Sequence, residues 1–204
     1  MFSELLRHRF PDLEAAKIAV LENHWELLRL WNKKLNLTTI NELGTSVERH
    51  YAESLFLGLH LPPVPLQIAD IGSGPGFPGF PVGVLRPDCI VTLIESHQRK
   101  AVFLREASRK VRNVRVLAQR AEDVSERFDL VISRAVSYQD LEGSLLKLAS
   151  NAMLLTGKEV PPDSLGFAWD SPIILPWGDR RFLRTGIALN RSNVPQLPGF
   201  KPPD

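Results

Sequence analysis

Five glycines and three prolines are concentrated in the stretch DIGSGPGFPGFPVGVL, residues 70–85. An apolar run precedes them, so the stretch stands where a buried strand would turn into a helix. Glycines at such a junction adopt backbone angles closed to other residues and let a ligand approach the main chain closely. The spacing fits two signatures. Gly72, Gly74 and Gly76 form a GxGxG pattern, and a GxGxxG dinucleotide fingerprint begins at Gly74. We therefore expect a cofactor-binding turn here.

Charged residues follow the next apolar runs along the chain. Glu95 ends the second run, nineteen residues after Gly76, where an acid can accept hydrogen bonds from ribose hydroxyls. Ala121 and Glu122 come just after the third run, where an acid can meet an adenine amino group. Arg134 ends the fourth run. Because the carboxyl ends of parallel strands meet at one edge of a sheet, we expect these residues to surround one ligand.

Asp70 separates two classes of cofactor. It lies two residues before Gly72 and completes a D-x-G-x-G-x-G pattern. A carboxylate there would repel the pyrophosphate of a dinucleotide, whereas it suits the ammonium group of S-adenosylmethionine. The order of the acids therefore favours an S-adenosylmethionine-dependent methyltransferase. An NAD-dependent oxidoreductase that uses the GxGxxG spacing is the alternative.

Short apolar runs that alternate with helical stretches must position these residues. Runs rich in Ile, Val and Leu are typical of parallel strands buried on both faces. We predict strands at residues 66–72, 90–96, 114–119, 128–134 and 152–157, and helices at 78–86, 97–111 and 139–150. This alternation indicates an α/β fold with a Rossmann-like, doubly wound and mostly parallel sheet.

The two ends of the chain differ from this central part. Residues 1–60 are predicted to be an N-terminal helical extension, because apolar residues recur at helical spacing from Asp12 to Leu35 and a second helix is expected from Thr45 to Leu59. The Rossmann-like domain is expected at 66–190, ending in an antiparallel hairpin built from 171–177 and 181–190. We expect 191–204 to be a flexible tail.

Composition narrows the class of protein. The 204 residues are 44% hydrophobic and 24% charged, which is ordinary for a globular protein. The sequence shows no signal peptide and no apolar stretch long enough to span a membrane. The single cysteine, Cys89, excludes an internal disulfide and a multi-cysteine metal site, and it stands at the start of a predicted strand. We expect a cytoplasmic, monomeric protein without a metal.

A run of basic residues stands out although the formal net charge is only +2. Its eight members are Arg99, Lys100, Arg105, Arg109, Lys110, Arg112, Arg115 and Arg120. Such a run indicates either a solvated helix face or a surface that contacts nucleic-acid phosphates. If a methyltransferase acts on RNA, the second interpretation gains weight, with Arg99 and Lys100 as the candidate RNA-binding residues.

Six segments together resemble one known family. They are NLTTI at 36–40, RHYAESL at 49–55, the glycine stretch with the following RP, VTLIESHQRKAVFLRE at 91–106, RAED at 120–123 and FDLVISRAV at 128–136. In this order they resemble the RsmG (GidB) methyltransferases, which methylate N7 of one guanine in bacterial small-subunit ribosomal RNA. The resemblance extends from about Trp31 to about Leu148. Beyond it, Gly157 precedes Lys158, whereas the family usually has a Lys-Gly pair.

The resemblance implies a class I methyltransferase with defined site residues. The backbone around Gly72 and the side chain of Phe77 would line the S-adenosylmethionine site. Glu95 would face the ribose, and Ala121 and Glu122 the adenine. Arg134 would stand at the reacting end of the pocket, as the candidate catalytic residue. Small-subunit ribosomal RNA, free or assembled, would be the partner.

The residue types agree with transfer to guanine N7. That nitrogen carries a free lone pair, so attack on the sulfonium methyl needs in-line positioning and no strong base. Methylation of a pyrimidine C5 would need a cysteine nucleophile, and Cys89 is predicted at the wrong edge of the sheet. A second alternative is an RNA-binding protein with a vestigial cofactor pocket.

Overall fold

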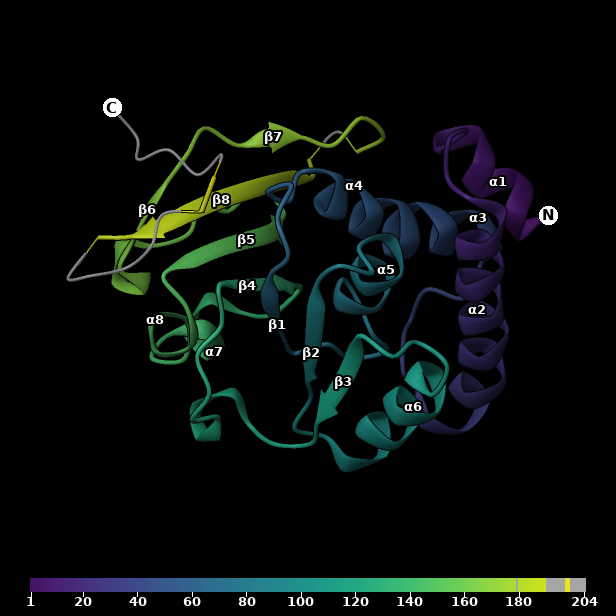
Figure 1. Cartoon of the computed structure of the whole chain (residues 1–204), viewed down its shortest axis with the longest axis horizontal. Helices are drawn as coiled ribbons and strands as arrows, with labels where there is room; N and C mark the ends of the chain where they lie inside the picture. The colour runs from purple at the N-terminus through teal and green to yellow at the C-terminus, as the bar shows by residue number, and fades with distance from the viewer. Residues whose placement is uncertain (179, 190–196, 199–204) are drawn as a thin grey trace.

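The computed structural model describes residues 1–178, 180–189 and 197–198, and its centre is one mixed sheet (Figure 1). Five strands carry the parallel part: β1 (Gln67–Ile71), β2 (Ile90–Ile94), β3 (Val114–Leu117), β4 (Leu130–Arg134) and β5 (Asn151–Thr156). Three more follow: β6 (Phe167–Trp169), β7 (Ile173–Ile174) and β8 (Phe182–Ala188). The order is β3-β2-β1-β4-β5-β8-β6, with β7 paired to β8. The Rossmann-like, mostly parallel prediction is confirmed.

Helices cover both faces of this sheet. The N-terminal helices are α1 (Phe2–Arg9), α2 (Ala15–Leu35), α3 (Leu43–Ser46), a π-helical turn at Val47–Ala52, and α4 (Glu53–Leu59). The crossovers contain α5 (Gly79–Leu85), α6 (Gln98–Ser108), a 3-10 turn at Ala121–Asp123, α7 (Tyr138–Leu141) and α8 (Leu145–Leu148), and a last 3-10 turn spans Asp163–Leu165. No helix in the described ranges has the length and apolar character that crossing a bilayer requires.

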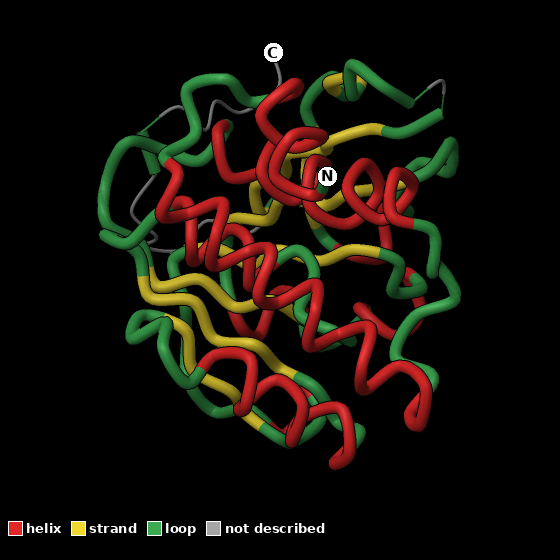
Figure 2. The backbone as a smooth tube through the Cα atoms, turned by 90° about the vertical axis from the view of Figure 1, so that its right-hand side faces the viewer, coloured by secondary structure: helices red, strands yellow, loops and turns green. Residues whose placement is uncertain are grey.

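Alternation along the strands divides the core into two layers. Ile68 and Ile132 belong to a cluster that includes the N-terminal helices, α5 and α6, whereas Ala69 and Val131 belong to a second cluster with α7 and α8. Figure 2 shows the helices of the first layer lying in front of the strands. The helices of 1–60 therefore share one hydrophobic core with the sheet.

Three local expectations differ from the structure. The second N-terminal helix begins at Leu43, two residues before Thr45, because the carboxylate of Glu42 accepts the amides of Gly44 and Thr45 at 2.7 and 2.5 Å. The single helix expected at 139–150 is two short helices, since Gly143 between them has a left-handed φ of 80°. The short strand β6 was not predicted.

The C-terminal hairpin is confirmed in its pairing. Ile173 and Ile174 of β7 pair with Leu183 and Phe182 of β8 in antiparallel register. β8 also pairs antiparallel with β5, which carries the hairpin into the main sheet. The tail expected at 191–204 lies outside the described residues, except for Leu197 and Pro198.

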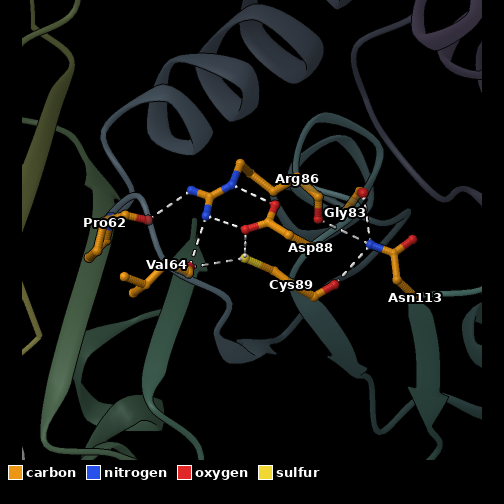
Figure 3. Close-up of polar contacts among 7 residues, drawn as sticks. All are labelled: Pro62, Val64, Gly83, Arg86, Asp88, Cys89 and Asn113. Carbon is orange, nitrogen blue, oxygen red and sulfur yellow. Dashed lines mark hydrogen bonds and ion pairs between the residues drawn. The ribbon is translucent and has the colours of Figure 1, made fainter.

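The amino edge of the sheet is closed by a polar network (Figure 3). The Arg86 guanidinium donates to the carbonyls of Pro62 and Val64, both at 2.9 Å, and to the Asp88 carboxylate at 2.7 and 2.9 Å. Cys89 lies buried within this network, and burial raises the pKa of its thiol. The one cysteine therefore lies at the edge opposite the carboxyl ends of the parallel strands.

Asn113 extends the network to the start of β3. Its side-chain amide nitrogen donates to the carbonyls of Gly83, Arg86 and Cys89 at 2.9–3.2 Å. These bonds hold the end of α5 close to the sheet, so Gly83 faces Val114 and Val91 with no room for a side chain.

The Gly83→Ala variant tests this close approach. An alanine normally stabilises a helix interior relative to glycine by about 0.5–1 kcal/mol. Here a Cβ would overlap the Val114 side chain, so we expect the free energy of unfolding to fall by about 1–3 kcal/mol in urea denaturation. Gly157→Ala is the control, because a Cβ there meets nothing within 4 Å. A stabilised Gly83→Ala protein would contradict the packing described.

Candidate cofactor site

A cavity of about 440 Å³ opens at the carboxyl ends of β1, β2, β3 and β4. Its wall includes Gly72, Glu95, Ala121 and Glu122, which come from three segments that are far apart in the sequence. The sequence-predicted residues at these positions therefore lie together. The loop after β4 completes the wall with Val136, and we call this space the cofactor cavity.

The glycine loop keeps its own amides bonded. The N–H groups of Gly72 and Ser73 both donate to the carbonyl of Ile94, at 3.0 and 3.2 Å. Those of Gly76 and Phe77 both donate to the carbonyl of Ser73, at 2.7 and 2.9 Å. The remaining donors of this fully described stretch are equally engaged: Gly74 to Glu95, Gly79 to Asp70 and Phe80 to Gly76.

This bonding has a chemical consequence for the two glycine signatures. Pro75 and Pro78 have no N–H, so no backbone donor of residues 72–80 is left for a phosphate. A dinucleotide site of the GxGxxG type holds its pyrophosphate with such donors at a helix start. The loop therefore suits a ligand that does not need free backbone N–H groups to bind a phosphate.

The three glycines of the GxGxG pattern have different surroundings. All have left-handed φ values: 69° at Gly72, 54° at Gly74 and 103° at Gly76. A Cβ at Gly72 would lie 2.5 Å from the Val136 side chain, at the cavity wall. A Cβ at Gly76 would instead lie 3.1 Å from Phe80, on the core side of the loop. Gly72 therefore lines the cavity, whereas Gly76 lets the loop pack on α5.

Glu95 is the best fixed acid in the wall. Its carboxylate accepts the N–H of Gly74 at 2.9 Å and that of His97 at 2.7 Å, and the residue is 7% exposed. Each carboxylate oxygen has a second lone pair for a ligand hydroxyl. Glu95 thus links the end of β2 to the glycine loop and still offers acceptors to the cavity.

The lining of the cofactor cavity is negatively charged. Four carboxylates line it: Glu95, Glu122, Asp140 and Glu142. Among the residues that the structure describes, the only lining guanidinium is that of Arg120, and it lies 3.0 Å from the Glu122 carboxylate. Four acids against one base leave a formal excess of three negative charges, which favours a cationic ligand and disfavours an anionic one.

Asp70 lies beneath the loop and not in the cavity wall. It is fully buried, and its Oδ2 accepts the N–H of Gly79 at 2.9 Å, at the start of α5. Burial raises the pKa of Asp70 to about 7. The carboxylate that distinguished the two cofactor classes in the sequence therefore holds the loop and helix together.

Two buried imidazoles connect the N-terminal helices to the site. Nε2 of His24 donates to the Pro75 carbonyl at 3.0 Å, so its Nδ1 accepts from the Tyr51 hydroxyl at 2.7 Å. Burial lowers the pKa of His24 to about 3, and the ring is neutral at physiological pH. The glycine loop is thus held from α2, which no pattern in the sequence indicates.

His50 joins the second N-terminal segment to β4. Its Nδ1 accepts from Arg134 at 2.9 Å, because a guanidinium can only donate, so its Nε2 donates to the Thr38 hydroxyl at 2.9 Å. The ring stacks on Phe77 at 4.5 Å. Burial lowers the pKa of His50 to about 3, and the charge of Arg134 adds to this effect.

Arg134 and Phe77 lie beside the cofactor cavity and outside its lining. The Arg134 guanidinium turns toward the N-terminal helices, where it donates to the Arg49 carbonyl at 2.9 Å and lies 3.9 Å from the Glu53 carboxylate. Burial lowers the pKa of Arg134 to about 10. Phe77 is 2% exposed and packs between His50 and Tyr51.

The remaining candidates lie on nearby elements. Arg99 is exposed and Lys100 half-buried, both in the first turn of α6, which follows β2 and Glu95. Sequence reasoning missed Asp140 and Glu142, although their position shortly after a predicted strand was a usable signal. Within the described ranges, no group of three or more His, Cys, Asp or Glu could hold a metal ion.

Comparison with known proteins decides the family. Residues 17–158 match the GidB family model, described as rRNA small subunit methyltransferase G. The chain belongs to this family. The resemblance to the RsmG (GidB) methyltransferases is therefore confirmed, over most of the helical N-terminal part and the parallel sheet.

Curated relatives carry the same description. A ribosomal RNA small subunit methyltransferase G from Roseiflexus sp. is 43% identical over 118 residues, which cover 54% of this chain and 50% of that protein. One from Mycoplasma capricolum is 38% identical over 146 residues, covering 67% of this chain and 63% of that protein. The chain thus spans about half to three fifths of the length of these relatives.

Solved structures support the fold. A SAM-dependent methyltransferase from Aquifex aeolicus aligns with a TM-score of 0.55 at 14% identity, over 71% of this chain and 93% of that one. A magnesium protoporphyrin IX methyltransferase from Synechocystis, solved with bound SAH, aligns with a TM-score of 0.56 at 10% identity, over 81% and 99%. At these identities the likeness concerns the fold, and the class I methyltransferase architecture is confirmed.

The pH dependence of stability tests the position of Asp70. Its pKa is raised from 3.8 to about 7 on folding, so the folded state binds the proton more tightly and stability falls as pH rises from about 4 to 7. Asp70→Asn cannot ionise. We expect its unfolding free energy, relative to wild type, to increase across this window and to level off above it.

The measurement is urea denaturation at a series of pH values, with the exposed Asp12→Asn as the control. A constant difference between Asp70→Asn and wild type from pH 4 to 7 would show that Asp70 is not buried as described.

Proposed function

We propose that this protein is an S-adenosylmethionine-dependent methyltransferase that modifies N7 of a guanine in bacterial small-subunit ribosomal RNA. The choice of cofactor rests on one observation: the cofactor cavity is negatively charged and lies beside a loop whose backbone N–H groups are all bonded. S-adenosylmethionine bears a sulfonium and an ammonium group, which acidic walls attract. NAD bears a pyrophosphate, which the same walls repel and which the loop has no donors to bind.

The lining residues fit the parts of this cofactor. Glu95 would accept the ribose hydroxyls with its remaining lone pairs, and Ala121 and Glu122 would face the adenine. Gly72 of the lining, and Gly74 in the same loop but outside the lining, would let the amino-acid end approach the main chain, since a Cβ at Gly74 would meet only a carbonyl at 3.9 Å. When bound, S-adenosylmethionine supplies an electrophilic methyl group on a sulfonium.

Methyl transfer to guanine N7 requires that the base and the cofactor are aligned, and it requires little acid–base chemistry. The attacking lone pair is free, so no proton has to leave before the methyl group moves. The described lining of the cofactor cavity has no cysteine, and the buried Cys89 lies at the opposite edge of the sheet. The chain's own contribution is to exclude water and to align base and cofactor.

Arg134 and Phe77 contribute to that alignment by their contacts. Arg134 bridges the end of β4 to His50 and Arg49, and Phe77 stacks on His50. These contacts support a positioning role for both residues from beside the cavity. Arg99 and Lys100 remain candidate RNA contacts on the adjacent first turn of α6. A ribosomal RNA substrate would place the protein in the bacterial cytoplasm.

Separate titrations with S-adenosylmethionine and NAD test the cofactor. We expect S-adenosylmethionine alone to bind, and Glu95→Gln to weaken it about tenfold or more, because a charge-assisted hydrogen bond is lost. Glu106→Gln, on the far part of α6, is the control. Binding of NAD alone would overturn the proposal, and full affinity in both Glu95→Gln and Glu95→Ala would overturn the assignment of Glu95.

Methyl transfer tests the activity and the substrate. The protein is incubated with radiolabelled S-adenosylmethionine and small ribosomal subunits, or their free RNA, from a bacterial strain that lacks the corresponding modification. We expect label in the RNA, and mass mapping is expected to locate it at N7 of one guanine. Tight RNA binding without transfer would instead favour an RNA-binding protein with a vestigial pocket.

A further inference from the structure

Three cavities follow one another along the carboxyl edge of the sheet. The cofactor cavity shares Val136 with a second cavity of about 320 Å³ at the ends of β4 and β5. This second cavity shares Arg181 with a third, of about 500 Å³. The third is lined by Arg49, Trp177, Gly178, Arg180 and Arg181, and we call it the arginine cavity.

The antiparallel direction of β8 places the arginine cavity at this edge. Phe182, the first residue of β8, pairs with Thr156, the last residue of β5. Residues that precede β8 therefore lie at the same edge as residues that follow the parallel strands. The π-helical turn supplies Arg49 from the other side, so the N-terminal segment and the C-terminal hairpin meet there.

A buried carboxylate fixes two of these arginines. Glu53 is fully buried and receives Nε and Nη2 of Arg181 at 2.9 and 2.7 Å, with Nη1 of Arg49 3.6 Å away. Arg180 is exposed at the rim. Among the described residues, three lining arginines against this one carboxylate leave a formal excess of two positive charges. Glu53 holds two of these arginines, Arg49 and Arg181, near the cavity before any ligand arrives.

The chemistry of the lining indicates a nucleotide phosphate. Guanidinium groups form a planar fork of donors that matches phosphate oxygens, and Trp177 adds an aromatic wall on which a base can stack. The sign of the charge is opposite to that of the cofactor cavity. The arginine cavity would thus attract an RNA strand that lies along this edge, and the cofactor cavity would repel its phosphates.

We propose that the arginine cavity binds a backbone phosphate of the RNA strand beside the target nucleotide, while the target base enters the second cavity. The inference rests on the proposed function, because it assumes an RNA substrate that reaches the cofactor through the second cavity. It assigns substrate binding to Arg49, Arg180 and Arg181, outside the basic run from Arg99 to Arg120.

Binding of protein-free small-subunit ribosomal RNA, without cofactor and over a series of salt concentrations, tests this. We expect Arg180→Gln to weaken binding roughly fivefold to tenfold and to reduce the slope of log affinity against log salt by about 0.7–0.9, as for one lost phosphate contact. Arg180→Lys should keep most of the slope. Arg127→Gln is the control, since Arg127 is exposed at the amino edge of the sheet.

Two results would overturn the inference. One is an Arg180→Gln protein that binds free RNA with the affinity and slope of Arg127→Gln. The other is a defect seen only with assembled subunits, which would assign the cavity to a protein partner. Titration with S-adenosylmethionine and methyl transfer by wild type are measured in parallel. Failure of these two with the RNA effect intact would overturn the proposed function and leave the phosphate site standing.

Discussion

The hydrogen bonds of two buried, uncharged imidazoles are the constraint on which the site depends. His24 holds the glycine loop through the Pro75 carbonyl, and His50 holds Arg134 at the end of β4. Each ring uses one nitrogen as donor and one as acceptor, an arrangement that protonation would destroy. Burial lowers the pKa of both to about 3, so these links persist over the physiological range. The N-terminal helices are thus the support against which the loop and β4 are set.

Given that support, charge is distributed along one edge of the sheet. The cofactor cavity has an excess of acidic residues, and the arginine cavity two cavities away has an excess of basic ones. Both signs are fixed by backbone and side-chain bonds within the protein: Glu95 by the amides of Gly74 and His97, and Arg181 by Glu53. A cationic cofactor and an anionic strand can therefore approach neighbouring parts of the same edge without competing for the same walls.

The parallel sheet and the cofactor cavity could be predicted from the sequence because both follow from local patterns. Gly72, Glu95 and Glu122 follow parallel strands, so they lie at one edge of the sheet whatever the course of the connecting segments. Contacts between distant segments left no such pattern. The bond from His24 to the Pro75 carbonyl joins residues 51 positions apart, and nothing around either residue signals it. Asp70 was expected beside the ligand and instead lies beneath the loop. Its position in the strand does not reveal in which direction its carboxylate points.

The π-helical turn at Val47–Ala52 links distant parts of the molecule through consecutive residues. Arg49 lines the arginine cavity, His50 bonds Arg134, and Tyr51 bonds His24. A shift of this turn by one residue would misplace all three contacts at once. In evolutionary terms, the helical extension and the sheet can change their sequences only in concert here. The extension cannot be exchanged between relatives as an independent module, even though it precedes the sheet in the chain.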